Sequence, residues 1–339
     1  MTSPDFLNSP FDAHRIPLGA GKALVYWTLG ARTNADGSAR PVLIALHGMR
    51  DVGRSLAPIA HRLANQYFVV LPDLRGHGNS VAPGSYAIAH FLMDLRRLIK
   101  QIDAPKVALL GHSLGGHICC RYAGIYTTEI EALVVLEGLG PPLAKHPDVP
   151  PNKYAPTYSP PEEDPALLAQ RLDEAIATSA FAQSPRVLPN RAEAARRLKQ
   201  NNPGLGDAYA QKLSEWLTIP APAPNEESGV RWCFDPCVQE VFLGISHNRG
   251  RDYWRRISAP TLIVFGDRGH EYWRAMRNEP GYTGRFEAQD LKERLGSFQN
   301  VEQCVIPAAG HQLHYDQPKL VAERCETFLK NAAKHRQRN

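Results

Sequence analysis

The chain has 339 residues, of which 43% are hydrophobic and 22% are charged, and its formal net charge is +5 at pH 7. A chain of this length and ordinary composition can bury a large core, which predicts one main domain plus an insertion. Outside the tail at 334–338 the sequence has no dense run of basic residues, so it offers no footprint for a nucleic-acid partner.

The N-terminal residues 1–6 contain no basic stretch followed by an apolar core, so we expect no signal peptide. No window of the sequence approaches the roughly 18 uninterrupted apolar residues of a membrane-spanning helix. Six cysteines occur, and Cys233 and Cys237 have no second pair at metal-ligand spacing. We therefore expect a cytoplasmic protein with free thiols and no metal site.

Apolar runs of strand length recur along the chain. In chain order they predict buried strands at 41–46, 68–72, 107–110, 130–137, 260–267 and 301–307. Between the fourth and fifth of these runs the pattern changes to proline-rich stretches, at 141–142, 150–151 and 160–161. Amphipathic patterns then predict helices at 164–180, 191–200 and 207–217, an extended stretch at 219–224 and a helix near 237–244.

The run at 107–110 leads directly into the pentapeptide Gly111-His-Ser-Leu-Gly115, and a helical pattern follows. A G-x-S-x-G sequence between a strand and a helix is typical of a nucleophile elbow. The turn is tight enough that Gly111 and Gly115 must lack side chains, and Ser113 then projects beside the positive end of the helix dipole. The sequence therefore predicts Ser113 as a nucleophile.

Over residues 15–140 and 255–335, four separate motifs occur in the order found in the α/β-hydrolase superfamily, which the chain resembles. The serine in the elbow is similar to that of the serine hydrolases, whereas dehalogenases and epoxide hydrolases of this fold carry an aspartate there. The resemblance implies an α/β fold class: a mostly parallel twisted sheet with helices on both faces.

The family places a cap after its sixth strand, where this chain carries its proline-rich and helical stretch. We therefore expect residues 1–140 and 258–339 to form the core domain and residues 141–257 to form a helical cap, or lid. A cap over the strand ends excludes water and shapes the pocket. About half of its aromatic residues should line an apolar pocket above the nucleophile, the candidates being Trp216, Trp232, Phe234, Tyr253 and Trp254.

A serine hydroxyl needs an adjacent base, and in this fold the base comes late in the chain. His311 follows the last predicted strand in the sequence Ala-Ala-Gly-His-Gln-Leu-His. The final loop of the family resembles Gly-His-x-x-x-x-(Glu/Asp)-x-Pro, which assigns the base to His311. His314, three residues later, is the alternative.

The third member of the catalytic triad, an acid that orients the histidine, is less clearly indicated by the sequence than the serine and the histidine. Most family members have it in a Gly-x-x-Asp pattern after the strand that follows the cap, and here that position holds Gly269. Some branches, including haloalkane dehalogenases and zearalenone lactonases, use a glutamate at the end of the strand before the cap, which here is Glu137. A buried carboxylate there needs a partner such as His311. We expect Glu137 to be the acid, with Asp267 and Glu271 as alternatives.

Acyl transfer also requires hydrogen-bond donors for the oxyanion of the tetrahedral intermediate. The backbone N–H of Leu114, directly after the nucleophile, should be one donor, and the N–H of Met49, after the His47-Gly48 turn, the other. We expect Arg50 and Asp51 to brace this loop.

These features predict a serine hydrolase that cleaves an ester, thioester or lactone of a small, apolar substrate through an acyl-enzyme, with no cofactor. Two alternatives stay open. One is a carbon–carbon bond hydrolase that uses the same triad, and the other is a ligand-binding receptor that keeps the fold with little turnover.

Overall fold

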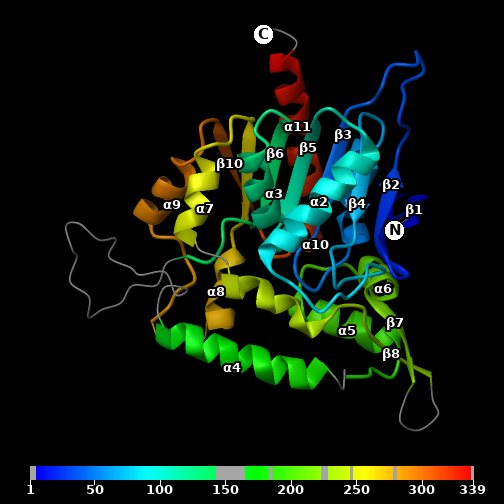
Figure 1. Ribbon diagram of the computed structural model, residues 1–339, viewed down its shortest axis with the longest axis vertical. Helices are drawn as coiled ribbons and strands as arrows, with labels where there is room; N and C mark the ends of the chain where they lie inside the picture. Colours follow the sequence, from blue (N-terminus) through cyan, green and yellow to red (C-terminus); the bar gives the residue numbers. More distant parts are fainter. Residues whose placement is uncertain are drawn as a thin grey trace.

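The computed structural model describes residues 5–142, 165–182, 186–222, 228–244, 247–277 and 281–336, and an eight-stranded sheet forms its centre (Figure 1). The strands, in spatial order, are β1 (Asp12–Gly19), β2 (Lys22–Leu29), β4 (Phe68–Pro72), β3 (Val42–Leu46), β5 (Val107–His112), β6 (Ile130–Leu136), β9 (Thr261–Gly266) and β10 (Val301–Ile306). β2 is antiparallel to both of its neighbours, and every pair from β4 to β10 is parallel.

The six strands expected from the apolar runs are all present, as β3, β4, β5, β6, β9 and β10. The β1–β2 hairpin was not predicted. Its first strand is exposed at most positions and buries only Ile16 fully, so its sequence carries little apolar signal. The predicted α/β fold class is confirmed.

Helices cover both faces of the sheet, because side chains of a buried strand alternate between the faces. Ile44 of β3 lies in a core cluster with α2 (Ile88–Ile102) and α3 (Leu114–Ile125). Its neighbour Leu43 points the other way, into a cluster with α1 (Ala57–Leu63) and α11 (Pro318–Arg336). The shorter elements η1 (Asp5–Asn8), η2 (Gly53–Leu56), α7 (His247–Trp254), α8 (Gly269–Arg277), α9 (Ala288–Leu295) and α10 (Leu313–Asp316) complete the layers.

The chain between β6 and β9 contains α4 (Pro165–Ala182), α5 (Arg191–Asn201), α6 (Asp207–Leu217), β7 (Thr218–Pro222), β8 (Ser228–Trp232), η4 (Pro236–Gly244) and α7. α4, α5, α6 and the β7–β8 hairpin gather at one end of the molecule, at the bottom of Figure 1. The stretch expected to be merely extended at 219–224 is, over its described part, a strand paired with β8. The predicted proline pairs at 150–151 and 160–161 lie outside the described residues.

The chain leaves β6 through a segment that is anchored to α9. Arg294, which is buried, donates hydrogen bonds to the carbonyl oxygens of Leu139 and Pro141, at 2.7 and 3.0 Å, and to the carboxylate of Asp290 at 2.8 Å. Among the helices that the structure describes, none combines the length and the apolar character that crossing a bilayer requires.

The strand ends position four polar side chains along one edge of the sheet. Ser113 follows β5, Glu137 follows β6, Asp267 follows β9, and His311 comes shortly after β10. Because these strands are parallel, their carboxyl ends meet at the same edge, which is where ligands bind in open α/β sheets.

We expect Gly115→Ala to destabilise the fold, because a Cβ on Gly115 would overlap the backbone carbonyl oxygen of Leu46. Overpacking of this kind costs about 1–3 kcal/mol. Gly206→Ala is the matched control, since a Cβ there meets nothing within 4 Å. Urea denaturation monitored by circular dichroism should give a clear loss of unfolding free energy for Gly115→Ala only. Equal midpoints for the two variants would contradict this packing.

Candidate active site

Ser113 lies at the tip of a strained turn between β5 and α3. Its φ of 49° and ψ of −114° are values that non-glycine residues rarely adopt. A Cβ on Gly111 would collide with the backbone of Gly115, so the two glycines let the strand and the helix pass each other closely. This geometry holds the Ser113 hydroxyl clear of the sheet, at the opening of a cavity.

Three of the predicted residues make a continuous chain of contacts. Nε2 of His311 lies 3.0 Å from Oγ of Ser113, and Nδ1 of His311 lies 3.3 Å from Oε2 of Glu137. His311 and Glu137 are 6% and 5% exposed. The imidazole therefore stands between a hydroxyl that could give it a proton and a carboxylate that could stabilise its charged form.

The Glu137 carboxylate lies in the space that a side chain at position 269 would occupy. Its Oε1 accepts a 2.7 Å hydrogen bond from the N–H of Gly266, which fixes the carboxylate at the end of β9. A Cβ on Gly269 would lie 2.5 Å from that same oxygen, so the carboxylate fits only because residue 269 has no side chain. The absence of a side chain at Gly269, where the family has an aspartate, is therefore what allows Glu137, directly after β6, to reach His311.

The alternative acids lie elsewhere. The carboxylate of Asp267 accepts hydrogen bonds from the N–H groups of Ala308 and Ala309, both at 3.0 Å. Slight burial raises the pKa of Asp267, but these two N–H groups outweigh it and hold the pKa below its ordinary value. Asp267 therefore ties down the loop that leads to His311. Glu271 is exposed on α8.

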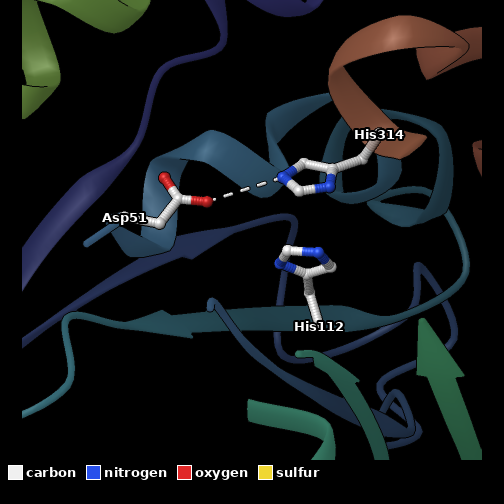
Figure 2. Close-up of side chains that lie close together, drawn as sticks. All are labelled: Asp51, His112 and His314. Carbon is white, nitrogen blue, oxygen red and sulfur yellow. Dashed lines mark ion pairs between the residues drawn. The ribbon is translucent and has the colours of Figure 1, made fainter. Parts of the chain in front are cut away.

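His314, the alternative base, belongs to a separate buried group with Asp51 and His112. Nε2 of His314 lies 3.5 Å from Oδ2 of Asp51, and its ring packs edge to face on His112 at 4.6 Å between centroids (Figure 2). His112 in turn donates from Nε2 to the backbone carbonyl of His311, at 2.8 Å, which steadies the loop carrying His311. Burial holds the pKa of His112 well below its ordinary value, so the ring is neutral.

Ligand atoms of Asp51, His112 and His314 lie within 4.8 Å of one another, close enough to raise the question of a metal ion. The two imidazoles contact each other directly, edge to face, at an angle of 61° between their planes. The carboxylate of Asp51 is also already engaged, with hydrogen bonds from Val52, Ser55 and Tyr315. We interpret the group as internal support for the His311 loop.

Two further buried histidines hold the loop that carries Met49. Nε2 of His47 accepts the N–H of Leu74 at 2.9 Å, and Nε2 of His77 accepts the N–H of Arg50 at 3.0 Å. Burial lowers the pKa of His77 to about 3, so this ring stays neutral and keeps a lone pair for the bond. We expect from the sequence that His77 packs or hydrogen-bonds rather than reacts, and its bonding partner lies 27 residues away in the chain.

Ser113 opens onto a cavity of about 320 Å³. The residues lining it are Met49, Arg50, Ser113, Leu114, His117, Glu137, Pro141, Glu174, Ala175, Gln239, Glu240, Phe242, Leu243, Tyr272, Trp273 and Met276. They come from the segments that follow the strand ends, from the start of α3, from α4 and η4, and from α8. Both predicted oxyanion donors, Met49 and Leu114, therefore lie beside Ser113 on this cavity.

The expectation about its aromatic lining was wrong, since none of the five predicted aromatics lines this cavity. Trp216 packs in a core cluster with α6, and Trp254 stacks on Phe298. The aromatic rings present in the wall are Phe242, Tyr272 and Trp273. Sequence analysis selected none of these three, although an aromatic pair near the start of a helix that begins at Gly269 was a usable signal.

Comparison with known proteins identifies the family of the chain. Residues 41–318 match the family model of the alpha/beta hydrolase fold. The first curated relatives include an uncharacterized protein of Mycobacterium bovis, 30% identical over 101 residues, so the match spans 30% of this chain and 30% of that protein's length. The proline iminopeptidase PfmaB of Pestalotiopsis fici is 24% identical over 85% of this chain and 92% of its own.

Among solved structures, the thioesterase domain from the curacin biosynthetic pathway superposes with a TM-score of 0.70, at 22% identity, over 93% of this chain and 98% of the domain. At this level of identity the likeness shows the fold. Since the family model covers most of the sequence, the chain belongs to the alpha/beta hydrolase fold family.

Proposed function

We propose that this protein is a serine hydrolase that cleaves a carboxylic ester, thioester or lactone through an acyl-enzyme intermediate. The observation that carries the proposal is the line of contacts from Glu137 through His311 to Ser113, which ends at a cavity. A nucleophile, a base and an orienting acid in this order are the elements that acyl transfer requires.

In the proposed reaction His311 takes the proton of the Ser113 hydroxyl as Oγ attacks the carbonyl carbon of the substrate. His311 then gives that proton to the leaving alcohol, thiol or lactone oxygen, which leaves an acyl group on Oγ. A water molecule deprotonated by His311 hydrolyses this ester, releases the acid and restores the Ser113 hydroxyl. Glu137 fixes the imidazole tautomer and stabilises the imidazolium throughout.

The oxyanion of each tetrahedral intermediate would be held by the backbone N–H groups of Leu114 and Met49. Leu114 is the first residue of α3, so its N–H is not used by the helix and points from the positive end of the helix dipole. The loop carrying Met49 is held on one side by the bond from the Arg50 N–H to His77, and its first residue, His47, accepts the N–H of Leu74, which supports a fixed donor position.

The same proposal assigns residues 141–257 to a cap that shapes the pocket. Support comes from the cavity wall, to which α4 contributes Glu174 and Ala175 and η4 contributes Phe242 and Leu243. Ala175, Phe242 and Leu243, together with Met49 and Leu114, make much of the wall apolar, which favours an ester or lactone with an apolar acyl or alcohol group.

A second candidate is hydrolysis of an amide next to a free amino group. Glu174 and Glu240 place two carboxylates on the cavity wall, and a carboxylate is the natural partner of an ammonium group. One full-length relative carries the name proline iminopeptidase. A panel of p-nitrophenyl esters, thioesters, lactones and prolyl p-nitroanilide separates the two candidates by their relative kcat/KM.

Ser113→Ala and His311→Ala should each lower kcat by about three decades or more, and the double variant should cost little beyond either one, because the residues act as a unit. Hydrolysis of p-nitrophenyl esters measures the rates, and a fluorophosphonate probe measures the reactivity of the serine. Ser38→Ala, a variant in an exposed loop, is the control. Full labelling of Ser113→Ala by the probe would refute the assignment.

Glu137→Gln should lower kcat by about 10³–10⁴-fold, since it favours the wrong tautomer of His311. Asp267→Asn should keep most of the activity and lose thermal stability instead, because it weakens the bonds to Ala308 and Ala309. Kinetics and melting curves on both folded variants give the ranking. The opposite ranking in kcat would move the acid to Asp267.

Phe242→Ala should change kcat/KM for esters with a bulky acyl group by about 10–200-fold and leave acetate esters nearly unaffected. Trp254→Ala is the contrasting variant, since Trp254 lies in the core against Phe298 and should reduce only thermal stability. The ratio of kcat/KM for long and short esters is the measurement. An unchanged ratio in Phe242→Ala would count against the cap as a determinant of the pocket.

A further inference from the structure

One face of the His311 imidazole is covered by an aromatic ring. The ring of Tyr272 is parallel to it within 5°, with 3.9 Å between the centroids. Trp273, the next residue, packs edge to face against the same imidazole at 5.3 Å and 76°. Both residues come from the first turns of α8, which starts at Gly269.

The stack covers a face of the imidazole ring, whereas the contacts with Ser113 and Glu137 involve only its edge. Ser113 and Glu137 meet the two nitrogens at the edge of the ring, so they fix its position within its own plane. They do not prevent the ring from tilting out of that plane. Tyr272 opposes such a tilt from one side, and His112 packs at 5.2 Å as a further neighbour.

The face of an aromatic ring carries partial negative charge, so it attracts a cation held over it. A neutral imidazole gains little from this attraction, whereas an imidazolium gains more. The Tyr272 ring itself stays uncharged, because burial raises the pKa of its hydroxyl although the Arg50 guanidinium acts in the opposite direction. The titratable groups that contact His311 include Glu137 and the neutral His112, and the Arg50 guanidinium acts on Tyr272.

We propose that Tyr272 is a positioning residue of the hydrolytic reaction: its ring face holds the His311 imidazole in plane and stabilises the imidazolium that forms as Ser113 is deprotonated. This inference rests on the proposed function. It also gives α8, the helix after β9, a role in the reaction, although its first residue, Gly269, supplies no acid.

The test begins with the free protein and needs no substrate. The titration of His311 is followed by NMR of ¹³C-labelled histidine, with its signal assigned from the spectrum of His311→Gln. Tyr272→Leu keeps an apolar side chain over the imidazole but removes the π face, and it should lower the pKa of His311 by about 0.5–1 unit. Tyr272→Phe keeps the face and should leave the titration unchanged.

Tyr26→Leu is the matched control. Tyr26 stacks on His14 at 4.9 Å and 16°, so this variant also removes a tyrosine–histidine stack, but from the β1–β2 hairpin. The His311 titration and the activity of Tyr26→Leu should match those of the native protein.

The kinetic arm uses the same variants with a p-nitrophenyl ester. In Tyr272→Leu the acid limb of the kcat/KM profile should move to lower pH together with the NMR titration, and kcat at the plateau should fall by about 10-fold. Tyr272→Phe should retain both the acid limb and kcat.

Two results would overturn the proposal. A His311 titration in Tyr272→Leu within about 0.2 unit of the native value would make Tyr272 a plain wall of the cavity. A loss in Tyr272→Phe as large as that in Tyr272→Leu would assign the effect to the hydroxyl group. Because the NMR arm is independent of turnover, a failure of the stack is distinguishable from an active Ser113→Ala, which would instead reject the hydrolase proposal.

Discussion

The arrangement of this site depends on the burial of one carboxylate. Glu137 is 5% exposed, and an ionised carboxylate removed from water is costly unless its oxygens are paired. One oxygen is paired with the backbone N–H of Gly266, and the other faces Nδ1 of His311. The position of His311, the glycine at 269 and the end of β9 are therefore coupled, since moving any of them would leave a buried charge unpaired.

A second constraint is the neutrality of the histidines beneath the site. His47, His77 and His112 are buried, and burial holds the pKa of each below its ordinary value. Each therefore has one N–H and one lone pair. His47 and His77 use both, each linking a backbone carbonyl to a backbone N–H, whereas His112 uses its N–H on the carbonyl of His311. Unlike a salt bridge, such a link involves no buried net charge and does not weaken as ionic strength rises.

The fold was largely predictable because its central strands are apolar at nearly every position, and buried parallel strands have this signature. Ser113 and His311 were selected from motifs, in which local sequence determines local geometry. Glu137 and Asp267 could not be separated in the same way, since both follow strands that end at one edge of the sheet. Their difference depends on contacts with Gly269 and with the loop at 308–309, which only tertiary structure reveals.

The aromatic wall was mispredicted for a related reason. Hydrophobicity places Trp216 and Trp254 inside the molecule, but it does not distinguish a core cluster from the wall of a cavity. Tyr272 lies on the wall because α8 starts immediately after β9, and a glycine at its start brings the helix close to Glu137. Aromatic side chains can therefore lie either in a core cluster or on the cavity wall, depending on how the helices that carry them are connected to the sheet.

The hydrogen bonds of Arg294 limit the movement of the chain beside the site. Arg294 binds the backbone carbonyl oxygens of Leu139 and Pro141, which lie just after Glu137 at the start of the connection to β9. The same guanidinium donates to Asp290 of α9, so these backbone bonds attach the segment to a core helix. The backbone directly after Glu137 is therefore tied to a core helix, which restricts how far the carboxylate facing His311 can shift.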